Sequence, residues 1–162
     1  MSSTPQAPSE AQPPATFQIE KVYVKDLSLE IPNAPKVFLE QVQPQLEVRI
    51  DTSAEAFSDG YYEVTVGATV TARIGERTLF LVEAKQAGIF AVRNVPAQEL
   101  DPLLGIACPN VLFPYLRETI SDVVVRGGFP PVLLAPLSFE ALYLQRLQEQ
   151  GQGGGNVQIA RS

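Results

Sequence analysis

Few residues of this chain are suited to catalysis, and the first to consider is its only cysteine, Cys108, in the segment GIACPNVLFPYLRE. A cysteine nucleophile is usually activated by a neighbouring histidine or another cation, and cysteine and histidine together build most zinc sites. The 162 residues include no histidine, so neither a Cys–His pair nor a His/Cys metal site can form within the chain. We therefore interpret Cys108 as a small buried residue at the entry to a helix. A cysteine hydrolase is the least favoured function, and unchanged function in Cys108→Ser would exclude it.

Other catalytic motifs are absent from the sequence. The Gly-rich segment GQGGGN lies near the C-terminus with no helix after it, so it does not form a phosphate-binding loop. No serine-nucleophile motif occurs, and no histidine exists to complete a triad. The acidic residues stand in alternating strands or on exposed helix faces, as solvated surface residues do. The sequence therefore predicts no catalytic residue, no metal and no cofactor, and so no enzyme.

The charge balance restricts the possible partners. The chain carries 18 acidic and 12 basic residues, a net charge of −6. Nucleic acids and anionic membrane surfaces bind clustered Lys and Arg, so neither is the expected partner. Basic segments of other proteins fit an acidic chain better. No signal peptide, transit peptide or membrane-spanning apolar run is apparent, so we expect a cytoplasmic protein without direct membrane insertion.

Four segments have the pattern of β-strands, at residues 17–31, 46–52, 61–74 and 77–94. The third alternates without a break, and the two residues Gly75 and Glu76 predict a tight turn that makes the last two strands antiparallel. The first strand has most apolar residues at one parity, but Val22 and Val24 at the other. This predicts either two apolar faces or a bulge in its middle, and Gly88 predicts a bulge in the fourth strand.

Helical spacing begins after residue 95. We expect Asn110 to cap a long helix that starts near Val111 and ends at Gly127-Gly128, and Ser138 to cap a second helix over 138–150. Four strands followed by two main helices predict an α+β fold with a four-stranded antiparallel sheet. The Pro-, Ser- and Gln-rich residues 1–15 and the Gly- and Gln-rich residues 151–162 predict disordered tails around a single domain at 16–150.

Two connections are unusually apolar for surface loops. Residues 32–45 and 129–137 are both rich in proline and in Val, Leu and Phe. Because loops lie on surfaces, these segments indicate either an oligomer interface or a groove for an apolar ligand. It is equally possible that they cover the sheet edges and pack inward.

Three spaced segments resemble the SecB family of protein-export chaperones: YVKDLSLEIPNAPKVF, GIFAV and ACPNVLFPYLRETISDVVVRGGFPPVLLAPLSFEALY. The specific elements are PNAP, CPN-x-LFPY-x-RE and RG-x-FP-x-x-LAP, and the resemblance covers about residues 16–147 in collinear order. It implies a SecB-like fold and a homotetramer built as a dimer of dimers. It also implies that the protein binds unfolded precursor proteins without ATP, keeps them translocation-competent and delivers them to the SecA motor.

The resemblance also implies roles for particular residues. An apolar client groove is expected between the two apolar connections, with contributions from Val37, Phe38, Val42, Leu46, Phe129, Leu133 and Leu134. Many family members carry a tryptophan at the position of Val42, so this chain loses a large contact surface there. The surface that contacts SecA, through its C-terminal zinc-binding tail and its motor body, is matched at Asp26, Glu30, Leu81 and Glu83. The long helix is expected at the interface between dimers, through Tyr115, Leu116, Ile120 and Val123.

Two further alternatives stay open from the sequence. A general cytoplasmic holdase that is not coupled to export would use the same groove without the acidic surface. A carrier of small apolar ligands could share the fold and the cleft, and only binding data distinguish it from a chaperone.

Overall fold

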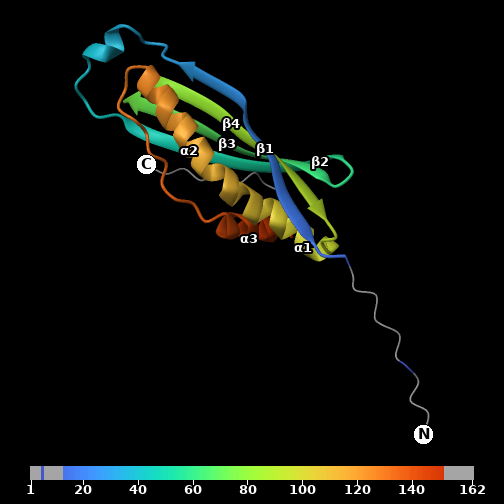
Figure 1. Ribbon diagram of the computed structural model, residues 1–162. Coiled ribbons are helices and arrows are strands. Elements are labelled where there is room, and N and C mark those ends of the chain that lie inside the picture. The colour runs from blue at the N-terminus through green and yellow to red at the C-terminus, as the bar shows by residue number, and fades with distance from the viewer. Residues whose placement is uncertain (1–4, 6–12, 152–162) are drawn as a thin grey trace.

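A computed structural model describes residue 5 and residues 13–151 of the chain, and it has the predicted α+β fold (Figure 1). A four-stranded antiparallel sheet has the strand order β1-β4-β3-β2, and α2 packs on β3 and β4 on one face of it. None of the described helices has the length and apolar character needed to cross a membrane. The predicted tails at 1–15 and 151–162 lie almost entirely outside the described residues. The elements are β1 (Thr16–Glu30), a short 3-10 helix (Lys36–Leu39), β2 (Gln45–Ser58), β3 (Tyr61–Ile74), β4 (Arg77–Arg93), α1 (Ala97–Pro102), a π-helical segment (Leu103–Ala107), α2 (Cys108–Arg126) and α3 (Phe139–Gln150).

The strand pattern of residues 61–74 is confirmed by burial. One face of β3 forms the centre of the core, with Val64, Val66 and Val70 fully buried. The turn at Gly75 joins β3 to β4, with Ile74 opposite Arg77, and Gly75 has the positive φ of 61° that a Gly-first turn requires. β2 is longer than predicted, because pairing with β3 extends it through the Ala- and Ser-containing segment up to Ser58.

Two β-bulges in β1 explain its mixed parity. The register shifts between Ile19 and Lys21 and again between Val24 and Asp26, so Glu20 and Lys25 are the inserted residues. Each bulge reverses the alternation that follows it. As a result, apolar residues of both parities reach the face that packs under α2: Phe17, Ile19, Val22, Val24, Leu27 and Leu29.

The predicted bulge at Gly88 is wrong. Gly88 pairs regularly with Val22 on one side and Val64 on the other. The glycine has a different reason: a Cβ atom there would lie 3.0 Å from Leu112 Cδ2 and 2.9 Å from Phe90 Cε2. The side chains of Phe90 and Leu112 therefore leave no room for a Cβ atom at this position.

The predicted helix start near Val111 is also wrong. Asn110 is not a cap, because α1, the π-helical segment and α2 follow one another directly from Ala97 to Arg126 (Figure 1). The end of α2 is as predicted: Gly128 has φ 90°, its N–H donates to Val125 O at 3.0 Å, and Phe129 N–H donates to Val124 O at 3.2 Å. The cap of α3 is also confirmed, since Ser138 Oγ accepts from the N–H of Ala141 at 3.1 Å.

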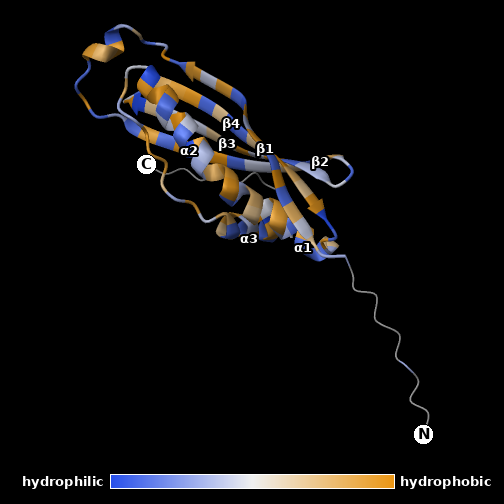
Figure 2. Ribbon diagram, viewed as in Figure 1, coloured by the Kyte–Doolittle hydropathy of each residue, from blue (hydrophilic) through white to orange (hydrophobic). Residues whose placement is uncertain are grey.

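α2 presents its most apolar side to its own sheet. Hydrophobic and hydrophilic bands alternate along it in Figure 2, and Leu112, Leu116, Ile120 and Val124 are fully buried. Leu116 and Ile120 were predicted at the interface between dimers. That prediction is wrong for both, because these side chains lie in the core of a single chain and cannot reach a second one.

Cys108 lies in the same core, which confirms its interpretation as a small buried residue. Its side chain is fully buried, and desolvation raises the pKa of the thiol to about 12. Because the thiolate is the reactive form, the thiol is poorly suited to act as a nucleophile at neutral pH.

Candidate functional site: an apolar groove and an acidic sheet face

An apolar groove lies where the connection after β1 meets the loop after α2, at one end of the sheet (Figure 1). It is a cavity of about 470 Å³, open to solvent. The short helix that forms part of its wall is largely hydrophobic in Figure 2. Five of the predicted client-groove residues line it together: Val37, Phe38, Val42, Leu46 and Phe129.

Stacked aromatic rings join the two connections. The centroids of Phe38 and Phe129 are 5.2 Å apart, and those of Phe129 and Phe80 are 4.8 Å apart. Phe80 and Val37 are buried and anchor the stack, whereas Phe38 remains 47% exposed and Val42 61% exposed. A Cβ atom at Gly128 would lie 3.1 Å from Phe38 Cε1, so this glycine also leaves room for the ring. The groove thus combines a fixed aromatic floor with apolar side chains that are still accessible.

Leu133 and Leu134 do not line this groove, contrary to the prediction. Burial alternates along this loop: Val132 lines the groove, Leu133 is exposed to solvent and Leu134 is buried in the core. The prediction missed Leu79 and Phe80 of β4. In the sequence, the two adjacent apolar residues interrupt the alternation of the fourth strand, and this interruption could have indicated them. In the structure it coincides with a register shift between β3 and β4.

The rim of the groove carries one ion pair. Glu40, which contributes to the lining, pairs with Arg77 at the start of β4. The described residues contain no group of three or more His, Cys, Asp or Glu side chains that could hold a metal ion. The chemistry of the groove is therefore burial of apolar surface, with little to favour one sequence over another.

The sheet face opposite the helices brings together the other predicted set. Glu30 pairs with Leu81 across β1 and β4, Ser28 pairs with Glu83, and Asp26 pairs with Lys85. All four predicted contact residues therefore lie on one face of two neighbouring strands. We call Asp26, Glu30, Leu81 and Glu83 the acidic patch.

The carboxylates of the acidic patch have no ion-pair partner among the described residues. Elsewhere on the same face, Glu63 pairs with Lys25 at 2.5 Å and Glu47 pairs with Arg49 at 3.1 Å. Lys85 stands opposite Asp26 without forming an ion pair, so three carboxylates free of ion pairs lie on the same face as the apolar side chain of Leu81 among the described residues. This combination suits a basic segment that also carries apolar groups.

The two remaining residues of the predicted dimer–dimer interface are at the surface of α2. Tyr115 is 50% exposed and Val123 is partly exposed. Both residues are therefore accessible to a second copy of the chain.

Comparison with known proteins agrees with this architecture. The family model described as preprotein translocase subunit SecB matches residues 9–150. The protein-export protein SecB of Chromobacterium violaceum is 58% identical over 145 residues, which cover 90% of this chain and 95% of that protein. Its counterpart in Dechloromonas aromatica is 56% identical, covering 88% of this chain and 94% of that protein. The SecB-like chaperone Rv1957 of Mycobacterium tuberculosis, solved in complex with a ChAD peptide from an antitoxin, has the same fold: the TM-score is 0.62 at 18% identity, over 75% of this chain and 91% of that one.

Proposed function

The chain belongs to the SecB family, whose members are protein-export chaperones and not enzymes, and from that premise we propose that its groove binds unfolded precursor proteins and that its acidic patch delivers them to the SecA motor. The observation that carries the proposal is the convergence of four apolar side chains from two connections, together with Leu46 at the start of β2, on one open groove. Folded proteins hide the extended apolar segments that such a groove can bury, so only the unfolded form binds. A ligand that binds only the unfolded state shifts the folding equilibrium by mass action, without ATP.

The energetics favour several grooves acting together. Burial of apolar surface gains about 25 cal/mol per Å², and the bound client segment loses conformational entropy in return. One groove of about 470 Å³ is therefore a weak site for a flexible chain. A client that occupies several grooves of one oligomer gains avidity, because each later contact is intramolecular.

A homotetramer built as a dimer of dimers is part of the proposal. β1 is an edge strand, and Phe17, Ile19, Val24 and Leu27 remain exposed along it. An unpaired edge with exposed apolar side chains is suited to a second copy of the chain. The exposed residues of α2 supply the second contact, between dimers.

Replacing Tyr115 with aspartate is expected to dissociate the tetramer into dimers that remain folded. The Tyr115 ring is exposed in a single chain, so its replacement leaves the packing of the core unchanged. At an interface, a buried tyrosine commonly contributes about 2 kcal/mol or more to association, and this contribution is lost. The tetramer dissociation constant should rise at least about tenfold, measured by analytical ultracentrifugation. Glu140→Gln on exposed α3 is a control, and an unchanged dissociation constant for Tyr115→Asp would contradict this interface.

The experiment that tests the function as a whole is native mass spectrometry with an export precursor, presented once unfolded and once folded. We expect a tetramer that carries only the unfolded form. A monomer or dimer that ignores both forms would refute the proposal. Since the clients have not yet been exported when they bind, the proposed location is the cytoplasm.

A further inference from the structure

The side of the sheet on which the acidic patch lies depends on one bulge. Tyr23 pairs with Ala87 on the face opposite the helices. Strict alternation from Tyr23 would turn Leu27 and Leu29 to that face and Asp26 and Glu30 toward the core. The inserted residue Lys25 reverses the alternation, so the carboxylates reach the open face, and Leu27 and Leu29 turn to the helix side of the sheet, where Leu29 packs against the core.

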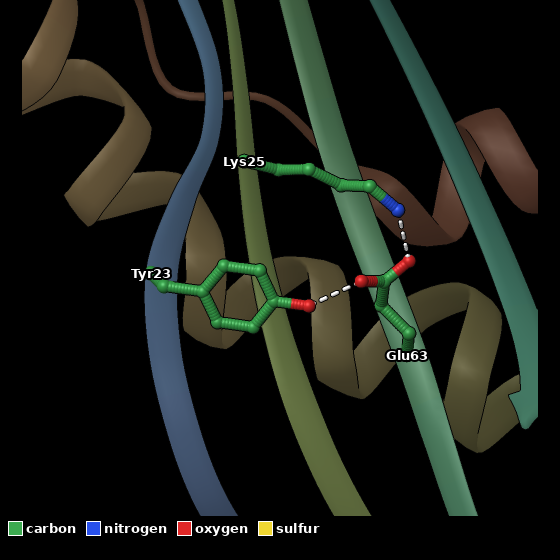
Figure 3. Close-up of polar contacts among 3 residues, drawn as sticks. All are labelled: Tyr23, Lys25 and Glu63. Carbon is green, nitrogen blue, oxygen red and sulfur yellow. Dashed lines mark hydrogen bonds and ion pairs between the residues drawn. The ribbon is translucent and has the colours of Figure 1, made fainter.

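A three-residue network holds this bulge in place (Figure 3). The Tyr23 ring crosses over β4, and its hydroxyl donates to Glu63 Oε2 on β3. Lys25 Nζ donates to the other carboxylate oxygen, Oε1, at 2.5 Å. Ala87, fully buried between β1 and β3, is small enough to let the ring pass. Tyr23, just before the bulge, and Lys25, the inserted residue, are thus both bonded to β3, a strand with which β1 does not pair.

The pKa shifts within the network keep the Glu63 carboxylate charged and the Tyr23 hydroxyl protonated at neutral pH. Hydrogen bonds from Lys25 and Tyr23 lower the pKa of the Glu63 carboxyl, so Glu63 is ionised at neutral pH. Burial, and then the hydrogen bond to Glu63, raise the pKa of Tyr23 to about 12, so its hydroxyl stays a donor. The Glu63 side chain is 19% exposed and the Lys25 side chain 47% exposed, so solvent partly screens their ion pair, and the bond from Tyr23 is the less exposed of the two.

We propose that Glu63, through Tyr23 and Lys25, is the positioning residue of the acidic patch: it fixes the bulge and holds the Lys25 ammonium over β3, away from the neighbouring Asp26. The role rests on the proposed function of the patch as the SecA-binding surface. Glu63 itself need not touch the partner. Without the network, the bulge loosens, and the Lys25 charge is free to compete with a basic partner for Asp26.

The test compares Lys25→Met and Tyr23→Phe with the matched control Lys85→Met, using purified SecA as the probe in isothermal titration. Lys85 also stands on the open face, opposite Asp26, but has no ion pair among the described residues. If charge alone mattered, removing either lysine would strengthen binding of a basic partner. We expect Lys85→Met to bind SecA as tightly as the wild type or more tightly. Lys25→Met and Tyr23→Phe should each bind on the order of tenfold more weakly, which corresponds to losing one hydrogen bond to a charged group.

Amide hydrogen exchange separates positioning from a general loss of stability. Lys25→Met and Tyr23→Phe should exchange faster at residues 24–27, while exchange in α2 and affinity for unfolded client stay at the wild-type level. Tighter SecA binding by Lys25→Met, or unchanged binding by Tyr23→Phe, would overturn the positioning role while the proposed function stands. Failure of the wild-type chain to bind SecA would instead contradict the proposed function, and Glu63 would then hold the bulge without serving a partner.

Discussion

Replacing Phe38 with aspartate is expected to lower the affinity for unfolded client protein on the order of a hundredfold. The Phe38 ring lines the groove and stacks on Phe129 at 5.2 Å, and it is still 47% exposed. One part of the ring therefore packs on the floor of the groove, and the other part can contact a client. A client can bury only the exposed half of the ring, which contributes roughly 1 kcal/mol, and a carboxylate at that place must in addition be desolvated before a client can cover it, which costs at least as much again. Fluorescence anisotropy with a labelled, permanently unfolded precursor measures the change.

The neighbouring Leu39 provides the control for this experiment. Leu39 is 84% exposed and does not line the groove, so Leu39→Asp introduces the same charge one residue away without touching the aromatic stack. It should change client affinity little, and both variants should bind SecA like the wild type. Equal loss of client and SecA binding in Phe38→Asp would indicate misfolding and would remove the support for this groove.

Replacing Glu83 with lysine is expected to weaken SecA binding on the order of a hundredfold and to leave client binding unchanged. Glu83 lies across from Ser28 in the acidic patch, and the patch carboxylates have no ion-pair partner among the described residues. The substitution turns an attraction for a basic segment into a repulsion, and close charge pairs across interfaces contribute roughly 1.5–7 kcal/mol. Titration of SecA at several salt concentrations should show a weaker salt dependence than for the wild type.

Glu76→Lys makes the same change in net charge in the exposed turn between β3 and β4, outside the patch, and should bind SecA normally. Normal SecA affinity in Glu83→Lys would refute the assignment of the patch. Client binding with no SecA binding in the wild type would favour a general holdase that is not coupled to export.

Local patterns in the sequence were sufficient for most of the architecture. The alternation of residues 61–74, the turn at Gly75 and the caps at Gly128 and Ser138 are each set by neighbours a few residues away. Their backbone geometry follows from local sterics and hydrogen bonding, which the sequence displays directly. The same holds for the α+β fold class, which the order of the elements implies.

Pairing between distant strands decided the rest. The parity of Val22 and Val24 indicated an irregularity in β1, but only the register against β4 assigns the inserted residues, Glu20 and Lys25. In the sequence, Gly88 suggested a bulge. In the structure, a glycine is required there because Leu112 of α2 packs against this position.

The faces of α2 and the extent of the groove also required the tertiary structure. Helical spacing places Tyr115 and Leu116 on one apolar stripe, and only docking on the sheet shows that Leu116 is core and Tyr115 is surface. The placement of Phe38 and Phe129 in one groove came from the family resemblance and not from the local pattern. Neither source indicated Phe80, whose ring packs against Phe129. Periodicity shows which residues share one face of a helix or strand. Whether that face is buried depends on which other elements pack against it, and those elements lie far away in the sequence.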